Sequence, residues 1–343
     1  MTGAAPTAGA GAGVGPRLHH DAAPEAQPAA DPGRKTPLVV LIGPTASGKS
    51  ALAIRLAEML DARGTAAEIV NGDSMAVYKG MDIGTAKPSA AERARVPHHL
   101  IDVLNVTQTA SVADFQASAR QTIRELRSSG TVPILVGGSS LYVRAVIDDF
   151  EFPGTDPQVR ARWERQLADQ GPRALYEQLI TRVPDAQGAI EPGNGRRIVR
   201  ALEVLEITGH YSPHLPEPRY LLPAVHQFGL SLDRAVMDER ITQRVHQMFD
   251  AGLVDEVRGL IDQGLRSGVT ASRALGYQQV LAMLDGELDQ DAAIRATIDG
   301  TRRFARKQLG WFRRDPRITW LPAGAADLPE RIIATLDDGP ASH

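Results

Sequence analysis

The sequence predicts an α/β protein in which a parallel sheet is flanked by helices and carries a small helical insertion. Short, wholly apolar runs at 38–42 and 133–136 are typical of strands that are buried on both faces. Over 52–60 and 112–126, apolar residues recur every three to four positions, as they do on one face of a helix. Strands that alternate with helices in this way indicate parallel βαβ units.

The composition is that of a globular chain of about two domains. Hydrophobic residues make up 43% of the 343 positions and charged residues 23%, so a full core can form. The absence of cysteine excludes disulfides, thiolate metal sites and a cysteine nucleophile. The 38 basic and 41 acidic residues give a net charge of −3, which excludes a chain-wide basic coat for nucleic acid. No apolar run is long enough for a transmembrane helix, and we expect a cytoplasmic protein with no membrane partner.

Composition shifts along the chain predict its organisation. We divide it into a disordered Ala/Gly/Pro-rich tail at 1–35, an α/β core with C-terminal helices at 36–150 and 192–325, a helical insertion at 151–191, and a C-terminal tail at 326–343. Gly171-Pro172 separates two helical stretches within the insertion. One strong helical pattern covers 238–262, preceded by a strand around 228–230.

A glycine-rich loop follows the first predicted strand. Its residues match the pattern G-x-x-x-x-G-K-[ST] at every defined position: Gly43, Pro44, Thr45, Ala46, Ser47, Gly48, Lys49 and Ser50. In such a loop, backbone N–H groups and the positive end of a helix surround phosphate oxygens. Lys49 supplies a full charge, and Ser50 can hold Mg²⁺. The motif predicts a P-loop NTPase-like core that binds a diphosphate or triphosphate, without specifying what that group is attached to.

Two carboxylates and a glycine pair lie elsewhere in the predicted α/β core. Asp73 comes after the strand at 68–70, at the sheet edge where α/β folds bind ligands. It can act as a general base or hold a metal, but aspartate equally often caps a turn. Asp102 is a competing carboxylate. The segment 137–140, Gly-Gly-Ser-Ser, is a second possible ligand contact, although a glycine pair after a strand is usually only a turn.

The basic residues gather near the C-terminus. Between 292 and 317 there are eight cations against Asp299 and Asp315, with aromatic residues among them: Arg295, Arg302, Arg303, Phe304, Arg306, Lys307, Trp311, Phe312, Arg313, Arg314 and Arg317. Such interleaving favours phosphate contact and base stacking in a nucleic-acid site. Because only five of the 38 basic residues are lysine, arginine is abundant throughout the chain, and a solvated helix face explains the cluster equally well.

Taken in order, the motifs resemble the tRNA dimethylallyltransferase family, also called the tRNA isopentenyltransferases. The resemblance runs from about Thr36 to Trp320. It rests on the motifs at 43–50, 73–74, 78–88, 97–102, 113–115, 135–139, 200–204, 276–277 and 306–308. The segment 81–88, Met-Asp-Ile-Gly-Thr-Ala-Lys-Pro, makes it far more specific than a phosphate loop alone.

The resemblance implies a reaction and assigns roles. A dimethylallyl group passes from dimethylallyl diphosphate to N6 of the adenine 3′ of the anticodon, so the partners are the diphosphate and the tRNA anticodon stem-loop. The phosphate loop holds the diphosphate with Mg²⁺ at Ser50, Asp73 is the general base, Ser139 lies near the adenine, and Arg234 helps to hold the diphosphate. We expect a monomer.

The resemblance also assigns tRNA contacts. They are Asp73, Ser74, Met75, Ala76, Ser139, Arg160, Arg196, Arg197, Ile198, Val199, Arg200, Arg273, Ala274, Leu275, Gly276, Tyr277, Gln278, Thr301, Arg302, Arg303, Phe304, Ala305, Arg306, Lys307 and Gln308. Two positions depart from the family pattern. Ser139 stands where the family has threonine, and Gln278 stands where the family often has a basic residue.

Three rival functions use the same residues differently. A small-molecule P-loop kinase would bind ATP in the loop, and an isopentenyltransferase could act on free adenine nucleotides. Neither needs the insertion or the basic C-terminal segment. A non-catalytic RNA-binding protein would have no need of intact Lys49, Ser50 and Asp73.

Overall fold

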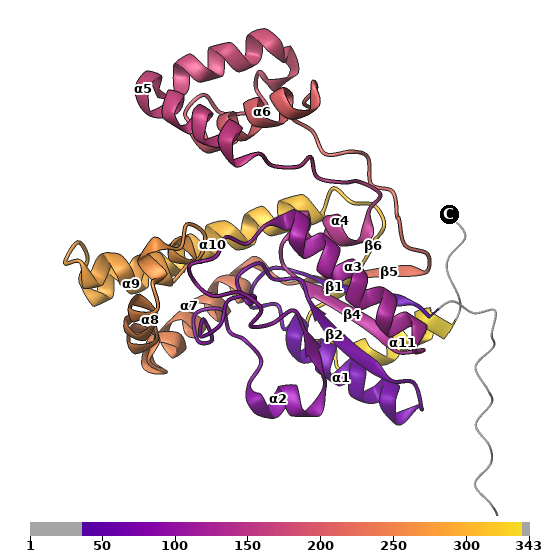
Figure 1. The fold of residues 1–343 in the computed structure, drawn as a ribbon. Helices are drawn as coiled ribbons and strands as arrows, with labels where there is room; N and C mark the ends of the chain where they lie inside the picture. The colour runs from indigo at the N-terminus through magenta and orange to yellow at the C-terminus, as the bar shows by residue number, and fades with distance from the viewer. Residues whose placement is uncertain (1–35, 338–343) are drawn as a thin grey trace, which may run out of the picture. The chain divides into compact units, whose positions relative to one another are not determined.

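A computed structural model describes residues 36–337, and these contain one six-stranded parallel sheet (Figure 1). The strand order is β3-β2-β4-β1-β5-β6. The strands are β1 (Leu38–Ile42), β2 (Ala67–Asn71), β3 (His98–His99), β4 (Val132–Gly137), β5 (Val225–Ser231) and β6 (Ile318–Pro322). The predicted class, a parallel sheet flanked by helices, is confirmed.

Eleven α-helices and three short 3₁₀ helices complete the described residues. They are α1 (Lys49–Ala62), α2 (Ala90–Arg95), α3 (Val112–Ser128), α4 (Ser140–Ile147), α5 (Pro157–Arg182), α6 (Gly195–Thr208), α7 (Arg234–Asp250), α8 (Leu253–Asp262), α9 (Tyr277–Leu284), α10 (Gln290–Phe312) and α11 (Leu328–Asp337), with η1 (Pro184–Ala186), η2 (Leu265–Ser267) and η3 (Ala271–Arg273).

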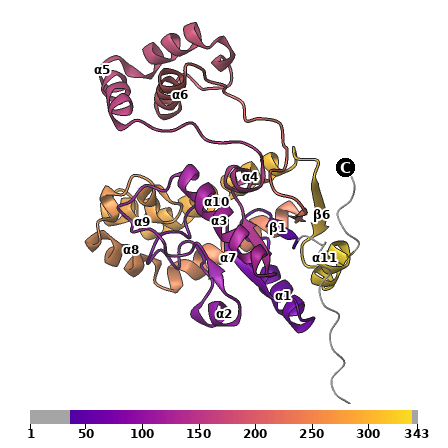
Figure 2. The same ribbon diagram turned by 45° about the vertical axis from the view of Figure 1, so that its right-hand side comes forward.

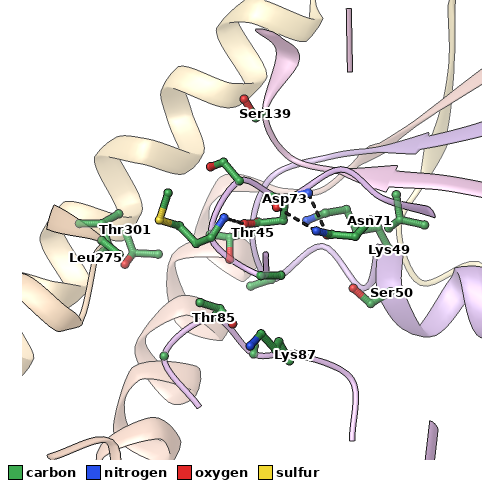
Figure 3. A pocket seen from close by; sticks show the side chains of 18 of the residues that line it. Thr45, Lys49, Ser50, Asn71, Asp73, Thr85, Lys87, Ser139, Leu275 and Thr301 are labelled. Atoms are coloured by element: carbon green, nitrogen blue, oxygen red, sulfur yellow. Dashed lines mark hydrogen bonds between the residues drawn. The ribbon is translucent and has the colours of Figure 1, made fainter. Parts of the chain in front are cut away.

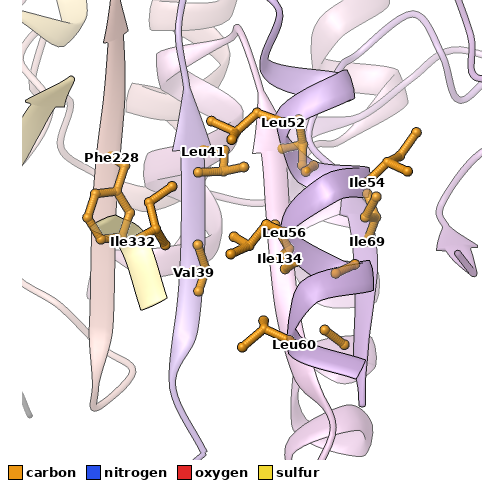
Figure 4. Packing of buried hydrophobic residues seen from close by; sticks show 14 of the residues in the cluster. Val39, Leu41, Leu52, Ile54, Leu56, Leu60, Ile69, Ile134, Phe228 and Ile332 are labelled. Carbon is orange, nitrogen blue, oxygen red and sulfur yellow. The ribbon is translucent and has the colours of Figure 1, made fainter. Parts of the chain in front are cut away.

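The central strands β1 and β4 are apolar and fully buried because helices cover both faces of the sheet. On one face, Leu52, Leu56 and Leu60 of α1 recur at helical spacing and pack against β1 and β4 (Figure 4). On the other face, α3 and α4 pack against the alternate strand residues, among them Val40 and Leu135. Burying a leucine side chain contributes about 1.5–3 kcal/mol, so these layers supply much of the stability of the core.

The C-terminal segment is a helix rather than the tail expected at 326–343. Within α11, Leu328, Ile332 and Leu336 recur every four residues and are buried in the core. Helix α11 lies beside α1 in both views (Figure 1 and Figure 2). The segment therefore belongs to the layer that covers the sheet. Residues 338–343, and the tail expected at 1–35, lie outside the described residues.

The helical insertion has its own apolar cluster. Helix α5 is interrupted at Gly171, whose φ of 78° is left-handed, so Gly171-Pro172 divides the segment as the sequence predicts. Trp163 and Leu175 of α5 pack with Ile198 and Leu202 of α6. The boundary expected at residue 191 falls inside this cluster, because α6 packs on α5 and not on the sheet.

A second helical layer stands beside the phosphate loop. Helices α7, α8, α9 and α10 share one buried cluster that also includes Ala46 of the loop and Tyr78. The helical pattern at 238–262 forms two helices rather than one, because Gly252 adopts a φ of 99° between α7 and α8. This layer supplies one wall of the cavity described next.

Candidate active site

A cavity of about 660 Å³ lies where the carboxyl ends of the strands meet the layer of helices α7–α10. Its walls come from the phosphate loop, the end of β2, the segment 84–88, the turn after β4, and helices α7 and α10. Figure 3 shows Thr45, Lys49, Asn71 and Asp73 close together on one side, with Thr301 across the cavity. The sheet edge predicted to bind a ligand is therefore hollow.

The phosphate loop has the backbone conformation of an anion site. Gly48 adopts a φ of 88° and immediately precedes α1, so the helix begins at Lys49 with its free N–H groups at the cavity. Ala46 also has a positive φ, 64°, which is strained for a residue with a side chain. Strain of this kind costs about 1–3 kcal/mol and is typical of functional sites.

Lys49 lies inside the loop. Its Nζ donates to the carbonyl oxygen of Pro44 at 3.2 Å. Burial lowers the pKa of Lys49 to about 8, an effect that Asp73 opposes and Arg244 reinforces. A bound diphosphate would favour the protonated form and offset this burial.

Asp73 is oriented by its neighbours. Its N–H donates to Asn71 Oδ1 at 2.9 Å, and Asn71 Nδ2 donates to the carbonyl oxygens of Asp73 and Leu100. Asp73 Oδ1 accepts from the N–H of Met75 at 2.8 Å, which is the turn-capping role. Among the described residues nothing hydrogen-bonds to Oδ2. The carboxylate therefore caps a turn with one oxygen and keeps the other for a ligand.

The glycine pair after β4 is required by close packing. A Cβ at Gly137 would meet Gly72 O at 2.7 Å, and one at Gly138 would meet Gln308 Nε2 at 2.4 Å. Ser139, which follows them, immediately precedes α4, makes no side-chain cap hydrogen bond to it, and lines the cavity. Ser139 is thus placed where a ligand in the cavity can reach it.

Asp102, the competing carboxylate, is already paired with two cations. Lys87 Nζ and Arg93 Nη1 each approach one of its oxygens at 2.6 Å. Although partial burial acts in the opposite direction, these two hydrogen bonds hold the pKa of Asp102 below its usual range. Asp102 therefore anchors the segment that carries Lys87 and is poorly placed to take a proton.

The two arginines of α7 differ in position. Arg234, assigned to the diphosphate by resemblance, is the first residue of α7; its side chain is 73% exposed, and it is not among the residues that line the cavity. Arg244 lines the cavity, and its Nη1 donates to Thr45 Oγ1 at 3.3 Å. Burial lowers the pKa of the Arg244 guanidinium. Sequence reasoning missed Arg244. Ile241 and Met248, three residues before it and four after it on α7, line the same wall of the cavity.

The segments expected to contact tRNA divide into two groups. About half of their residues line the cavity: Asp73, Ser74, Met75, Ala76, Ser139, Arg196, Arg273, Ala274, Leu275, Thr301, Phe304 and Gln308. Arg160 and Arg200, in contrast, both bind the buried carboxylate of Glu203, at 2.6 and 2.9 Å. These two arginines hold the insertion together, whatever else they contact.

The basic cluster of α10 also divides. Arg302 donates to Thr242 on α7 at 2.9 Å, and Arg317 binds Asp148 and Asp315. The remaining cations are exposed: Arg295, Arg303, Arg306, Lys307, Arg313 and Arg314. Phe304 and Trp311, two turns apart, are 44% and 45% exposed, and the Arg314 guanidinium lies 5.2 Å from the Trp311 ring centre. One part of the cluster is structural, and the other presents cations and aromatic rings to solvent.

Between residues 36 and 337, no helix combines the length and the apolar character needed to cross a membrane.

The chain is similar to a set of tRNA-modifying enzymes. The profile of the IPP transferase family matches residues 76–315. A tRNA dimethylallyltransferase of Thermobifida fusca is 56% identical over 298 residues, which cover 87% of this chain and 93% of that protein. Another, from Cutibacterium acnes, is 53% identical over 298 residues with the same coverage.

Solved structures show the same likeness. A full-length tRNA isopentenylpyrophosphate transferase from Bacillus halodurans is 38% identical with a TM-score of 0.63, covering 89% of this chain and 95% of that one. A eukaryotic dimethylallyltransferase acting on tRNA has a TM-score of 0.74 at 24% identity, covering 90% of this chain and 81% of its own, which shows a shared fold.

Proposed function

This chain belongs to the IPP transferase family of tRNA dimethylallyltransferases, and from that premise we propose that it transfers a dimethylallyl group from dimethylallyl diphosphate to N6 of the adenine 3′ of the tRNA anticodon. The observation that carries the proposal is one cavity that joins a phosphate loop to Asp73 and Ser139. Phe304 lines this cavity and is 44% exposed, so the cavity reaches the surface beside the exposed cations of α10.

The residues account for each change in the reaction. Transfer forms a bond between N6 and C1 of the dimethylallyl group and breaks the bond between C1 and the diphosphate oxygen. The electron pair of the broken bond leaves with pyrophosphate, where Lys49, Arg244 and the loop N–H groups stabilise the developing charge. The proton of N6 passes to Asp73, a step that typically contributes about 100- to 10,000-fold.

The oxygen donors at the loop fit a magnesium ion that is bound mainly through the substrate. Ser50 and Asp73 line the same cavity, and Mg²⁺ usually takes one or two protein ligands together with phosphate oxygens. No cluster of three acidic or histidine side chains occurs in the described part of the chain, so the substrate would have to supply the other ligands. We propose that Ser50 holds the ion, which would neutralise charge on the leaving diphosphate when bound.

The acceptor adenine must leave its stack to reach Asp73, because the carboxylate lies in a cavity and not on the surface. The exposed cations and rings of α10 are suited to hold the surrounding RNA. We propose that the protein acts as a monomer and in the cytoplasm, as the resemblance to the family implies.

Incubation of the full chain with dimethylallyl diphosphate, Mg²⁺ and unmodified tRNA, followed by nucleoside mass spectrometry, tests the proposal. We expect one adenosine to gain a dimethylallyl group, and Lys49→Ala to lose most of this activity. Parallel reactions with ATP as the donor, or with free adenine nucleotides as acceptors, report the rival functions. Transfer to a free nucleotide but not to tRNA, or phosphoryl transfer from ATP, would contradict the proposal.

A further inference from the structure

Gln308 differs from its two neighbours in the segment 306–308 by being buried at the cavity. It was expected to contact tRNA together with Arg306 and Lys307. Those two neighbours are exposed, whereas Gln308 is 7% exposed and lines the cavity. Because successive residues of a helix point about 100° apart, α10 turns Gln308 inward while it turns the two cations to solvent.

The Gln308 amide reaches two parts of the active site. Its Oε1 accepts a hydrogen bond from the N–H of Thr45, in the phosphate loop, at 3.1 Å. Its Nε2 occupies the space beside Gly138, since a Cβ built there would come within 2.4 Å of it. One side chain is therefore wedged between the phosphate loop and the glycine pair that precedes Ser139.

These two segments serve opposite ends of the proposed reaction. The loop follows β1 and the glycine pair ends β4, and the two strands pair directly, with Ile42 opposite Gly137. The loop and Ser139 both line the cavity, and in the proposed reaction the loop binds the diphosphate while Ser139 lies near the adenine. The Gln308 amide lies between the phosphate loop and the glycine pair, and it therefore sets the distance across which the dimethylallyl group must move.

We propose that Gln308 is a positioning residue that holds the phosphate loop and the 137–139 turn at a defined separation, and so aligns the donor with the acceptor adenine. This inference rests on the proposed function. It assigns to Gln308 an effect on the rate of transfer rather than on tRNA affinity. Glutamine suits the role because its amide offers an acceptor to Thr45 and a compact donor end to the glycine pair.

The first test compares Gln308→Ala with Gln290→Ala, an exposed glutamine at the start of the same helix. We expect Gln308→Ala to lower the single-turnover rate at saturating dimethylallyl diphosphate and tRNA by about 10- to 100-fold, since small misplacements of reacting groups have effects of this size. Affinity for an anticodon stem-loop, and its dependence on salt, should match those of wild type. Gln290→Ala should change neither quantity.

Two results would overturn the inference. A single-turnover rate of Gln308→Ala within twofold of wild type would show that no positioning is lost. A normal rate at saturation combined with weakened stem-loop binding would show that Gln308 contacts tRNA. Failure of the proposed function has a different signature, because wild type itself would then transfer nothing to tRNA.

A second test does not depend on Gln308→Ala alone. Gly138→Ala should be about as slow as Gln308→Ala, because its methyl group would displace the flexible Gln308 amide, while the φ of Gly138 is not in the left-handed region and the backbone itself tolerates alanine. In the double variant Gly138→Ala/Gln308→Ala the methyl group gains room. We expect the double variant to be no slower than Gln308→Ala, a non-additivity that requires contact between the two residues. If the rate losses of the two single variants add fully in the double variant, the proposed contact between Gln308 and Gly138 is contradicted.

Discussion

Tyr277 donates its phenolic hydrogen to Glu256 at 2.6 Å, next to the segment 84–88 that lines the cavity. The same carboxylate accepts the N–H groups of Asp82, Ile83 and Gly84 at 2.7–3.2 Å. A Cβ at Gly84 would come within 2.4 Å of the Tyr277 ring. Glu256 on α8 therefore ties the most family-specific stretch of the sequence to the beginning of α9, and burial raises the pKa of Tyr277 so that it stays a donor.

This arrangement predicts an order of stability effects. Tyr277→Phe removes one hydrogen bond to a charged acceptor and should lower the free energy of unfolding by about 1.5–3 kcal/mol. Glu256→Ala leaves the hydroxyl and three N–H groups without their acceptor and should cost more. Urea unfolding of both variants measures the order. Equal or reversed effects would show that the carboxylate is not the centre of this contact.

The lowered pKa of Lys49 predicts a pH-dependent affinity for the donor. Below about pH 8 the amine of the free enzyme is protonated and attracts the diphosphate. Above it, binding must first take up a proton, so affinity should fall by up to about tenfold per pH unit. The terminal phosphate, with a pKa of about 6, remains ionised over this range.

Calorimetric titration of dimethylallyl diphosphate between pH 7 and 9.5 checks the effect of Lys49. Lys49→Arg is the matched variant, because a guanidinium remains charged throughout and should flatten the profile. An equally steep fall in that variant would assign the pH dependence to another group.

The two arginines of α7 predict opposite outcomes. Arg244→Ala should lower kcat/KM for the donor by about 10- to 100-fold, the size expected for a lost hydrogen bond to a charged group. Arg234→Ala should stay within about twofold, because its side chain is exposed outside the cavity lining. Steady-state kinetics with varied dimethylallyl diphosphate distinguish the two. A large loss for Arg234→Ala alone would restore the assignment made by resemblance.

Asp73→Asn should bind both substrates and transfer the dimethylallyl group very slowly. Asparagine keeps an oxygen that can accept from Met75, so the turn survives, but it cannot take up the proton of N6. The loss should therefore appear in kcat. A thermal melt beside a single-turnover assay decides the role. If the variant melts early while its folded fraction turns over normally, Asp73 only caps the turn.

The exposed part of the basic cluster predicts a salt-dependent contact with tRNA. Replacing Arg306 and Lys307 with alanine should weaken stem-loop binding and reduce the slope of log affinity against log salt by up to about two, one for each phosphate contact. Arg63→Ala is the control, an exposed arginine at the opposite end of α1 from the phosphate loop. If the double variant keeps the wild-type slope, the face is merely solvated.

The sequence by itself determined the four central strands of the sheet (β1, β2, β4 and β5), the phosphate loop, and the position of Asp73 and Ser139 at the edge where these strands end; the outer strands β3 and β6 were not predicted. These features follow from short-range patterns: apolar runs for strands buried on both faces, glycines where the backbone must turn, and the rule that parallel strands end at one edge. The break at Gly171-Pro172 was equally local, because the backbone conformation of these two residues interrupts a helix.

Only the tertiary structure decided which polar side chains face the ligand. Arg244 rather than Arg234 reaches the loop because Arg244 lies on the part of α7 that lines the cavity, and Gln308 points inward because α10 lies against the same loop. Arg160 is engaged by Glu203, a partner 43 residues away on another helix that no spacing revealed. The partner of a charged side chain depends on contacts between elements far apart in the chain, and a local pattern carries no record of those contacts.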